Sequence, residues 1–172
     1  IKEFTSEKDA KETLAEIRKN KIEYVNTDIK ITSRSPYPPF TTSTLQQACA
    51  AGFNMTASQT MSHAQKLYEG ISVPGHDQVA LITYMRTDST RSSPEAIASA
   101  RDYIKNEFAS TYLPPSARSY TDKKGKHQQD AHEAVRPSHI DISHSSVRDS
   151  EQRKVYEIIW KRFVASQMAD AK

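Results

Sequence analysis

The feature that most constrains the fold is a proline-rich segment at Pro36, Pro38 and Pro39, three prolines within four positions. Each proline ring fixes its own backbone and removes an N–H donor, so neither a helix nor an inner strand can continue through this segment. We therefore interpret the segment as a linker. It leaves a short amino-terminal part and a longer part that has to supply the hydrophobic core.

Two elements are predicted before the linker. Ser6 can cap a helix over residues 6–20, whose apolar side chains recur at helical spacing while its other faces are charged. Residues 22–32 alternate apolar and β-branched side chains, with one change of phase that is typical of a bulge or bend. This second pattern predicts an extended strand.

Helices are predicted for most of the chain after the linker. The hydroxyl groups of Ser43, Thr56 and Ser93 can each cap a helix, and a last helix is predicted over residues 148–168. The helix that follows Thr56 carries the apolar residues Met61, Leu67 and Tyr68. Residues 79–82 form a short apolar run, which indicates a buried strand. The predicted fold class is mainly α with a minor β part (α+β).

Two other stretches lack helical periodicity. Residues 71–76 contain Pro74-Gly75 and are predicted to form a turn. Residues 116–146 are polar, and most of them are predicted to form a surface loop. A basic run at Lys123, Lys124 and Lys126 lies in this loop, and such runs are more often solvated surface than DNA contacts. We therefore leave these lysines out of the candidate site.

Composition excludes several kinds of site. Cys49 is the single cysteine, so no intrachain disulfide or cysteine-cluster metal site can form, and its expected role is core packing. We predict no metal site in this chain. The four glycines lack the spacing of a phosphate-binding loop, which argues against nucleotide binding, and no apolar run approaches the length of a membrane span. Lys and Arg number 24 against 21 Asp and Glu, a mildly basic balance that permits a polyanionic partner.

The most informative window is residues 82–91, directly after the predicted buried strand. A strand end fixes position while a loop exposes side chains, and catalytic groups are often mounted in this way. Tyr84 could attack phosphorus, although a phenol needs help to lose its proton near neutral pH. Arg86 could stabilise the phenolate and bind phosphate oxygens through its planar fork of donors. These two residues are the candidate catalytic pair.

Three more side chains of this window are candidate DNA contacts. Thr87 and Ser89 could donate hydrogen bonds, and Arg91 could hold the next phosphate along the strand. From composition alone, a tyrosine packed at a strand end beside a solvated polar turn is the more ordinary explanation. The order of the residues decides between the two.

Residues 82–89 read Ile-Thr-Tyr-Met-Arg-Thr-Asp-Ser, and this resembles the active-site signature of the type IA DNA topoisomerases, Ile-Thr-Tyr-x-Arg-Thr-Asp-Ser. Three further segments resemble that family and fall in the family's order along the chain: residues 38–47, 57–70 and 131–138. The resemblance extends from Pro38 to about Met168. Met85, at the variable position, is similar to the bacterial topoisomerase I branch.

The resemblance implies a role for each matching residue. Tyr84 would be the nucleophile that cleaves one DNA strand through a 5′-phosphotyrosine link, and Arg86 would steady the scissile phosphate. His132 would contact DNA near the cleavage site, where a histidine can donate to phosphate. Arg136 follows in the same block and is either a DNA backbone contact or a surface charge.

The family's complete reaction also needs a Toprim domain, which supplies an Asp-x-Asp pair, a glutamate and a lysine for Mg²⁺ and for acid–base work. No such unit occurs in this sequence. We therefore expect a fragment that is inactive by itself in relaxing DNA. Its expected partners are single-stranded DNA and the Toprim-containing remainder of the same enzyme, with no membrane or nucleotide, in the cytoplasm near the nucleoid.

The resemblance also implies the domain organisation. Residues 1–37 would belong to a β-rich strap domain, residues 38–168 would form the helical gate domain that carries the tyrosine, and residues 169–172 would begin the return into the strap. An alternative from another class is a noncatalytic module that binds single-stranded DNA. Such a module needs no reactive tyrosine.

Overall fold

The computed structural model describes residues 3–21, 23–120 and 132–171. The chain divides into two compact units, residues 1–32 and residues 33–172, and each is described by itself. The predicted basic run at Lys123, Lys124 and Lys126 lies outside the described residues. The strap and gate boundaries inferred from the resemblance stay a prediction.

The first unit contains one helix, α1 (Glu7–Lys19), among its described residues. Ser6 caps this helix, as predicted, because its hydroxyl accepts a hydrogen bond from the Asp9 backbone N–H at 3.2 Å. No residue of α1 is buried. Acidic side chains in its first turn and basic ones in its last turn complement the helix dipole. Local interactions of this kind, rather than packing, hold α1.

Residues 23–32 belong to no strand, so the predicted strand is wrong for this range. Their apolar side chains are exposed, with 92% of Val25 and 83% of Ile29 accessible to solvent. Alternating side chains give a segment two faces, but a strand also needs a neighbour to complete its backbone hydrogen bonds. The described residues of this unit supply no such neighbour.

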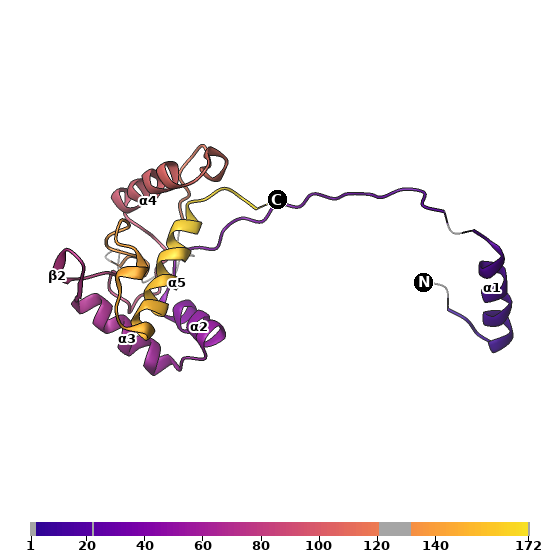
Figure 1. Ribbon diagram of the computed structural model, residues 1–172, viewed down its shortest axis with the longest axis horizontal. Helices are drawn as coiled ribbons and strands as arrows, with labels where there is room; N and C mark the ends of the chain where they lie inside the picture. The colour runs from indigo at the N-terminus through magenta and orange to yellow at the C-terminus, as the bar shows by residue number, and fades with distance from the viewer. Residues whose placement is uncertain (1–2, 22, 121–131, 172) are drawn as a thin grey trace, which may run out of the picture. The chain divides into compact units, whose positions relative to one another are not determined.

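The described part of the second unit contains four α-helices and two short 3₁₀ turns. The helices are α2 (Thr42–Phe53), α3 (Ala57–Glu69), α4 (Pro94–Glu107) and α5 (Ser150–Ser166), and the turns are η1 (Ser110–Tyr112) and η2 (His144–Ser146). Helix α5 packs against α2, α3 and α4, so it is the centre of this unit (Figure 1). The fold is mainly α with a small β part, as predicted.

Helix starts follow the predicted caps with one exception. Thr56 and Ser93 cap α3 and α4 through their hydroxyls, and Thr56 forms the predicted capping box with Gln59. The cap predicted at Ser43 is wrong, because the N-cap of α2 is Thr41, two residues earlier. Thr41 has a capping box of its own with Thr44. Several hydroxyl side chains in a row make such a boundary ambiguous from sequence.

The β part is a hairpin of β1 (Ile71–Val73) and β2 (His76–Val79), paired antiparallel. The turn predicted over residues 71–76 is confirmed only at Pro74-Gly75, where Gly75 takes a positive φ of 85°, because residues 71–73 and 76 belong to the two strands. The buried strand predicted over residues 79–82 is corrected. Residue 79 ends β2, whereas Ile82 is buried and forms only an isolated bridge with Pro137.

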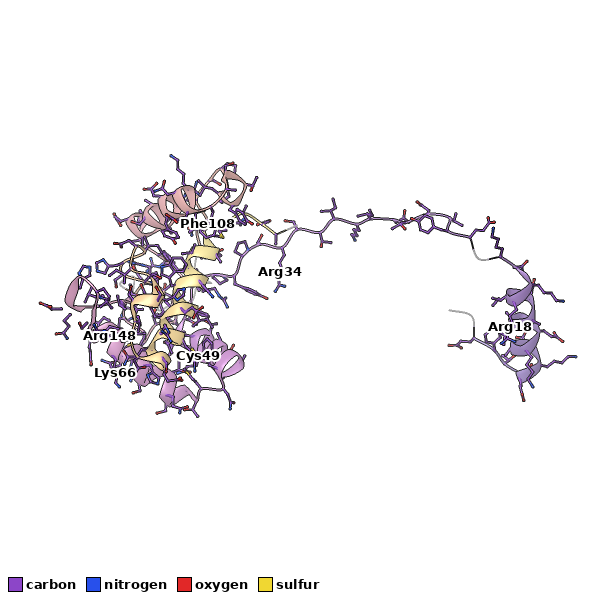
Figure 2. All side chains as sticks on the ribbon, viewed as in Figure 1. Arg18, Arg34, Cys49, Lys66, Phe108 and Arg148 are labelled. Carbon is purple, nitrogen blue, oxygen red and sulfur yellow. The ribbon has the colours of Figure 1, made fainter. Side chains whose placement is uncertain are left out.

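The core of the second unit joins α2, α3 and α5 to the segment that precedes Tyr84. Fully buried members include Leu45, Cys49, Leu67, Leu81 and Ile159. Cys49 lies on α2 (Figure 2), and burial raises the pKa of its thiol, so the predicted packing role of this cysteine is confirmed. Because Leu81 belongs to this core, the chain is fixed three residues before Tyr84.

Candidate active site

Residues 84–89 alternate between solvent and core. Tyr84, Arg86 and Asp88 are exposed, and we call these three side chains the outer face. Met85, Thr87 and Ser89 are buried, at 0%, 8% and 3% exposure, and we call them the inner face. The segment belongs to no strand and bends at Met85, so the two faces are defined here by exposure and not by a regular strand geometry. The inner face therefore anchors this segment in the fold, and the outer face is accessible from solvent.

Thr42, the first residue of α2, fastens the inner face. Its backbone N–H donates to the Thr87 carbonyl at 2.8 Å, and its hydroxyl accepts from the Thr87 N–H at 2.8 Å. The same hydroxyl donates to two carbonyl groups, that of Met85 at 2.7 Å and that of Thr87 at 3.0 Å. The backbone around Arg86 is thus bonded on both sides to a helix start, which limits how far the outer face can move.

A second set of bonds joins Thr83, the residue before Tyr84, to the segment that follows His132. The Thr83 hydroxyl donates to the Ala134 carbonyl at 2.7 Å and accepts from the Arg136 N–H at 3.0 Å. The Thr83 N–H donates to the Arg136 carbonyl at 3.0 Å. Isolated bridges pair residue 82 with residue 137 and residue 40 with residue 135. Three segments that are distant in sequence therefore meet beside Tyr84.

A cavity of about 400 Å³ opens at this meeting point. Its lining residues are Tyr68, Thr83, Tyr84, Thr87, His132 and Glu133. The structure thus brings three of the predicted site residues, Tyr84, Thr87 and His132, to one cavity. Tyr84 is 44% exposed, so its ring is available both to the cavity and to solvent.

The other predicted site residues do not line this cavity. Arg86 lies on the outer face, beside it in sequence but outside its lining. The hydroxyl of Ser89 accepts from the Arg91 N–H at 3.2 Å, and Arg91 itself lines a smaller cavity of about 100 Å³. Arg136 is largely buried and forms an ion pair with Glu133. The DNA contacts assigned to these residues stay predictions.

Sequence reasoning missed three residues that the cavity includes: Tyr68, Thr83 and Glu133. Tyr68 was grouped with the apolar side of its helix, yet it is 39% exposed while the neighbouring Leu67 is fully buried. An aromatic residue one position away from a helical apolar stripe is a signal for this difference. Glu133 is placed by its pairing with Arg136, which the short spacing between the two could have indicated.

Metal binding and membrane insertion find no support among the described residues. No three His, Cys, Asp or Glu side chains within residues 3–21, 23–120 and 132–171 gather closely enough to hold a metal ion. Over the same ranges, no helix combines the length and the apolar character that crossing a membrane requires. The cavity is lined by the phenols of Tyr68 and Tyr84, the imidazole of His132, the carboxyl group of Glu133 and the side chains of Thr83 and Thr87.

Comparison with known proteins agrees with this arrangement over the whole chain. A family model described as DNA topoisomerase matches residues 1–172. The DNA topoisomerase 1 of Helicobacter pylori is 43% identical over 173 residues, which cover 98% of this chain and 23% of that protein. The DNA topoisomerase 1 of Rickettsia felis is 42% identical over 166 residues, which cover 95% of this chain and 21% of that protein.

A solved structure agrees as well. The full-length topoisomerase I from Thermotoga maritima, in a monoclinic crystal form, superposes with a TM-score of 0.73 at 36% sequence identity. The match covers 99% of this chain and 26% of that one. Both the fold and the order of the matching segments are therefore shared with a topoisomerase.

These matches define the class of protein first, which is that of the DNA topoisomerases. The chain belongs to the type IA DNA topoisomerase family. Its relatives are bacterial DNA topoisomerase 1 proteins, which confirms the branch predicted from Met85. The chain spans about a quarter of the length of these relatives.

Proposed function

We propose that this chain is the tyrosine-bearing part of a longer type IA DNA topoisomerase and that Tyr84 is its nucleophile. The observation that carries the proposal is the placement of Tyr84, exposed at the edge of a cavity while the residues on either side are bonded or buried. A nucleophile needs a fixed backbone and an accessible reacting atom. Tyr84 has both.

In the proposed reaction, the Tyr84 phenolic oxygen attacks a backbone phosphorus of single-stranded DNA. A bond forms between this oxygen and phosphorus, and the bond from phosphorus to the 3′ oxygen breaks. The phenol gives up one proton and the departing 3′ oxygen takes up one, so the products are a 5′-phosphotyrosine and a free 3′ hydroxyl. After another strand has passed, the 3′ hydroxyl attacks phosphorus and restores both the DNA and the tyrosine.

Arg86 and His132 are proposed to act on the phosphate. A guanidinium offers two parallel N–H donors to phosphate oxygens, whose negative charge rises during attack. Arg86 follows Tyr84 by two residues and is also exposed, so both side chains are open to a DNA strand bound at this surface. His132 shares the cavity with Tyr84 and can donate to a phosphate bound there. Thr87, Ser89, Arg91 and Arg136 complete the proposed contacts with the DNA strand.

Acid–base chemistry and magnesium are proposed to come from outside this chain. Among the described residues, no group of three His, Cys, Asp or Glu side chains could hold a metal ion. A Toprim domain in the remainder of the enzyme would hold Mg²⁺, which supplies positive charge near the reacting phosphate. Without that domain the chain should not relax supercoiled DNA. The whole enzyme would work in the cytoplasm, at the nucleoid.

The test is reconstitution of covalent DNA attachment. The chain is mixed with a separately produced Toprim-containing remainder, Mg²⁺ and an end-labelled single-stranded oligonucleotide, and protein–DNA adducts are counted on a denaturing gel. Tyr84→Phe should abolish the adduct. Tyr112→Phe is the matched control, because Tyr112 is similarly exposed but lies away from the cavity, and it should leave the adduct unchanged. Attachment that survives Tyr84→Phe would exclude Tyr84 as the nucleophile.

The noncatalytic alternative makes a different prediction for binding alone. A module that only holds single-stranded DNA through basic side chains should lose affinity steeply as salt rises, and His132→Ala should leave its affinity nearly unchanged. A site that grips a phosphate beside Tyr84 should instead weaken when His132 or Arg86 is replaced. Fluorescence anisotropy of a labelled oligonucleotide with the chain alone separates the two.

A further inference from the structure

The ring of Tyr84 touches one other aromatic side chain, Tyr68, among the described ring contacts. The two ring centroids are 5.3 Å apart and the ring planes cross at 64°, an edge-to-face arrangement. Aromatic rings favour this geometry because the positive edge of one meets the negative face of the other. Both rings line the same cavity, and both are partly open to solvent, at 39% and 44%.

Tyr68 sits on a more rigid element than Tyr84 does. It belongs to the last turn of α3, and its neighbour Leu67 is fully buried in the core. Tyr84 instead lies in an irregular segment after the hairpin. A ring mounted on a packed helix can act as a fixed wall for a ring mounted on a loop.

The backbone keeps the two elements in register. The Leu81 N–H donates to the Leu67 carbonyl at 2.8 Å, so the end of α3 is bonded to the segment that leads into Tyr84. Hairpin β1–β2 connects Leu67 to Leu81 along the chain. The chain enters it through Gly70, at a φ of +107°, where an added Cβ would lie 2.9 Å from the Gln78 side chain. This close approach lets the hairpin fold back and return beside α3.

We infer that Tyr68 is a positioning residue, which limits the orientations of the Tyr84 ring to those from which its oxygen can reach a phosphate in the cavity. The inference rests on the proposed function of Tyr84. Backbone hydrogen bonds fix the main chain near Tyr84, but they leave the torsions of an exposed side chain free. The contact with Tyr68 involves only side chains of this chain, so it can order the Tyr84 ring without a contribution from the substrate, and the reaction then does not have to supply that ordering.

The position of Tyr68 also argues against a purely structural role. A core residue would be buried like Leu67, whereas Tyr68 is exposed enough to line the cavity. The remaining possibility is that its ring stacks on a DNA base, since exposed aromatic rings are common platforms for single-stranded DNA. Stacking would contribute to affinity, whereas positioning would contribute to the rate of attack, so the two can be separated.

The first test needs no reaction. Fluorotyrosine is placed at position 84 of the chain, and its ¹⁹F resonance is recorded with Tyr68, Tyr68→Phe and Tyr68→Ala. Phenylalanine keeps the ring edge and should keep the shift and the narrow line of the unsubstituted chain. Alanine removes the wall and should move the resonance toward that of a free side chain. An unchanged resonance in Tyr68→Ala would overturn the inference, whatever the fate of the proposed function.

The second test measures rate and affinity in the reconstituted enzyme. Tyr68→Ala should slow formation of the covalent adduct by roughly 3- to 10-fold, the range set by the loss of one edge-to-face contact. Affinity for the oligonucleotide should stay the same, and Tyr68→Phe should restore the rate. Tyr112→Ala is the matched control, because Tyr112 is an exposed tyrosine in contact with Phe108 instead, and it should change neither quantity.

The possible outcomes are distinct. A loss of affinity that accounts for the whole loss of rate would overturn positioning and assign Tyr68 to base stacking. A rate unaffected by Tyr68→Ala would also overturn it. If Tyr84→Phe still forms the adduct, the proposed function fails, while the ¹⁹F result still decides whether Tyr68 orders the ring.

Discussion

The outer and inner faces of residues 84–89 share one short backbone but have opposite surroundings. Tyr84, Arg86 and Asp88 point to solvent, and no described backbone group bonds their side chains. On the inner face, Met85 is packed in the core and the backbone at Thr87 is bonded to Thr42. The difference separates two tasks, because the inner face supplies rigidity and the outer face supplies reactive groups.

This division has an energetic consequence. A change on the inner face should act mainly on the free energy of unfolding, since it removes packing or leaves a buried polar group without a partner. A change on the outer face should act mainly on the reaction and leave stability nearly unchanged. The predictions below test whether the two faces are as independent as their environments indicate.

Arg86→Ala should give the largest effect, confined to the reaction. Removing a group that stabilises charge in the transition state typically costs on the order of 10²–10³-fold in rate. We expect a loss of that size in the rate of covalent adduct formation by the reconstituted enzyme. Arg86→Lys keeps the charge but loses the paired donors, so its rate should lie between that of the unsubstituted chain and that of Arg86→Ala. Thermal unfolding of the chain should be the same for all three.

Met85→Ala should give the largest effect on stability. The Met85 side chain is fully buried, and truncation of such a side chain costs about 2–5 kcal/mol. The fluorescence of Trp160, the single tryptophan, follows urea unfolding of the second unit. Met85→Leu preserves volume and should cost less than about 1.5 kcal/mol. Equal losses from Met85→Ala and Arg86→Ala would show that the faces are not separate.

Residues 23–32 also alternate in side-chain type, although all of them are exposed, and their comparison with residues 79–89 shows what the sequence could predict. Alternation predicted a strand over residues 22–32, which is wrong for the described residues 23–32, and a continuous apolar run predicted a strand over residues 79–82, of which only residue 79 belongs to one. The segment at Tyr84 is fixed by bonds to Thr42 and to residues 134–136, which no local pattern announces. A sequence pattern indicates which side chains share a face of a segment. It does not indicate which distant segment will form hydrogen bonds with that segment in the folded chain.

Helix caps were predictable because they are local. A hydroxyl and the N–H three residues later are brought together by the helix itself, which is why Ser6, Thr56 and Ser93 were found. The convergence of His132 and Tyr84 on one cavity was not predictable from spacing, since it depends on long-range bonds through Thr83. The family resemblance indicated both residues without indicating that they line the same cavity.

Thr83→Val should have an intermediate effect, on both the free energy of unfolding and the rate of adduct formation. Valine has nearly the same shape, but it leaves the Ala134 carbonyl and the Arg136 N–H without their partner, which costs about 1–3 kcal/mol of stability. These bonds also hold the segment of His132 against Tyr84, so adduct formation should slow as well. Thr83→Ser keeps the hydroxyl and should retain most of the stability and most of the rate of adduct formation. A valine variant of normal stability and activity would contradict the proposed link.

Asp88→Asn should give the smallest effect and is the strictest test of the comparison. Asp88 is exposed and, among the described residues, takes part in no hydrogen bond or ion pair, so amidation removes a charge with almost no change of shape. The free energy of unfolding should change by no more than about 0.5 kcal/mol, a range typical of surface sites. Urea unfolding followed by Trp160 fluorescence measures it. Asp88 lies between the buried residues Thr87 and Ser89. A larger loss in the free energy of unfolding would mean that the charge of Asp88 contributes to the stability of this segment. The outer face would then be part of what holds the segment, and the effects of Arg86 could no longer be assigned to the reaction alone.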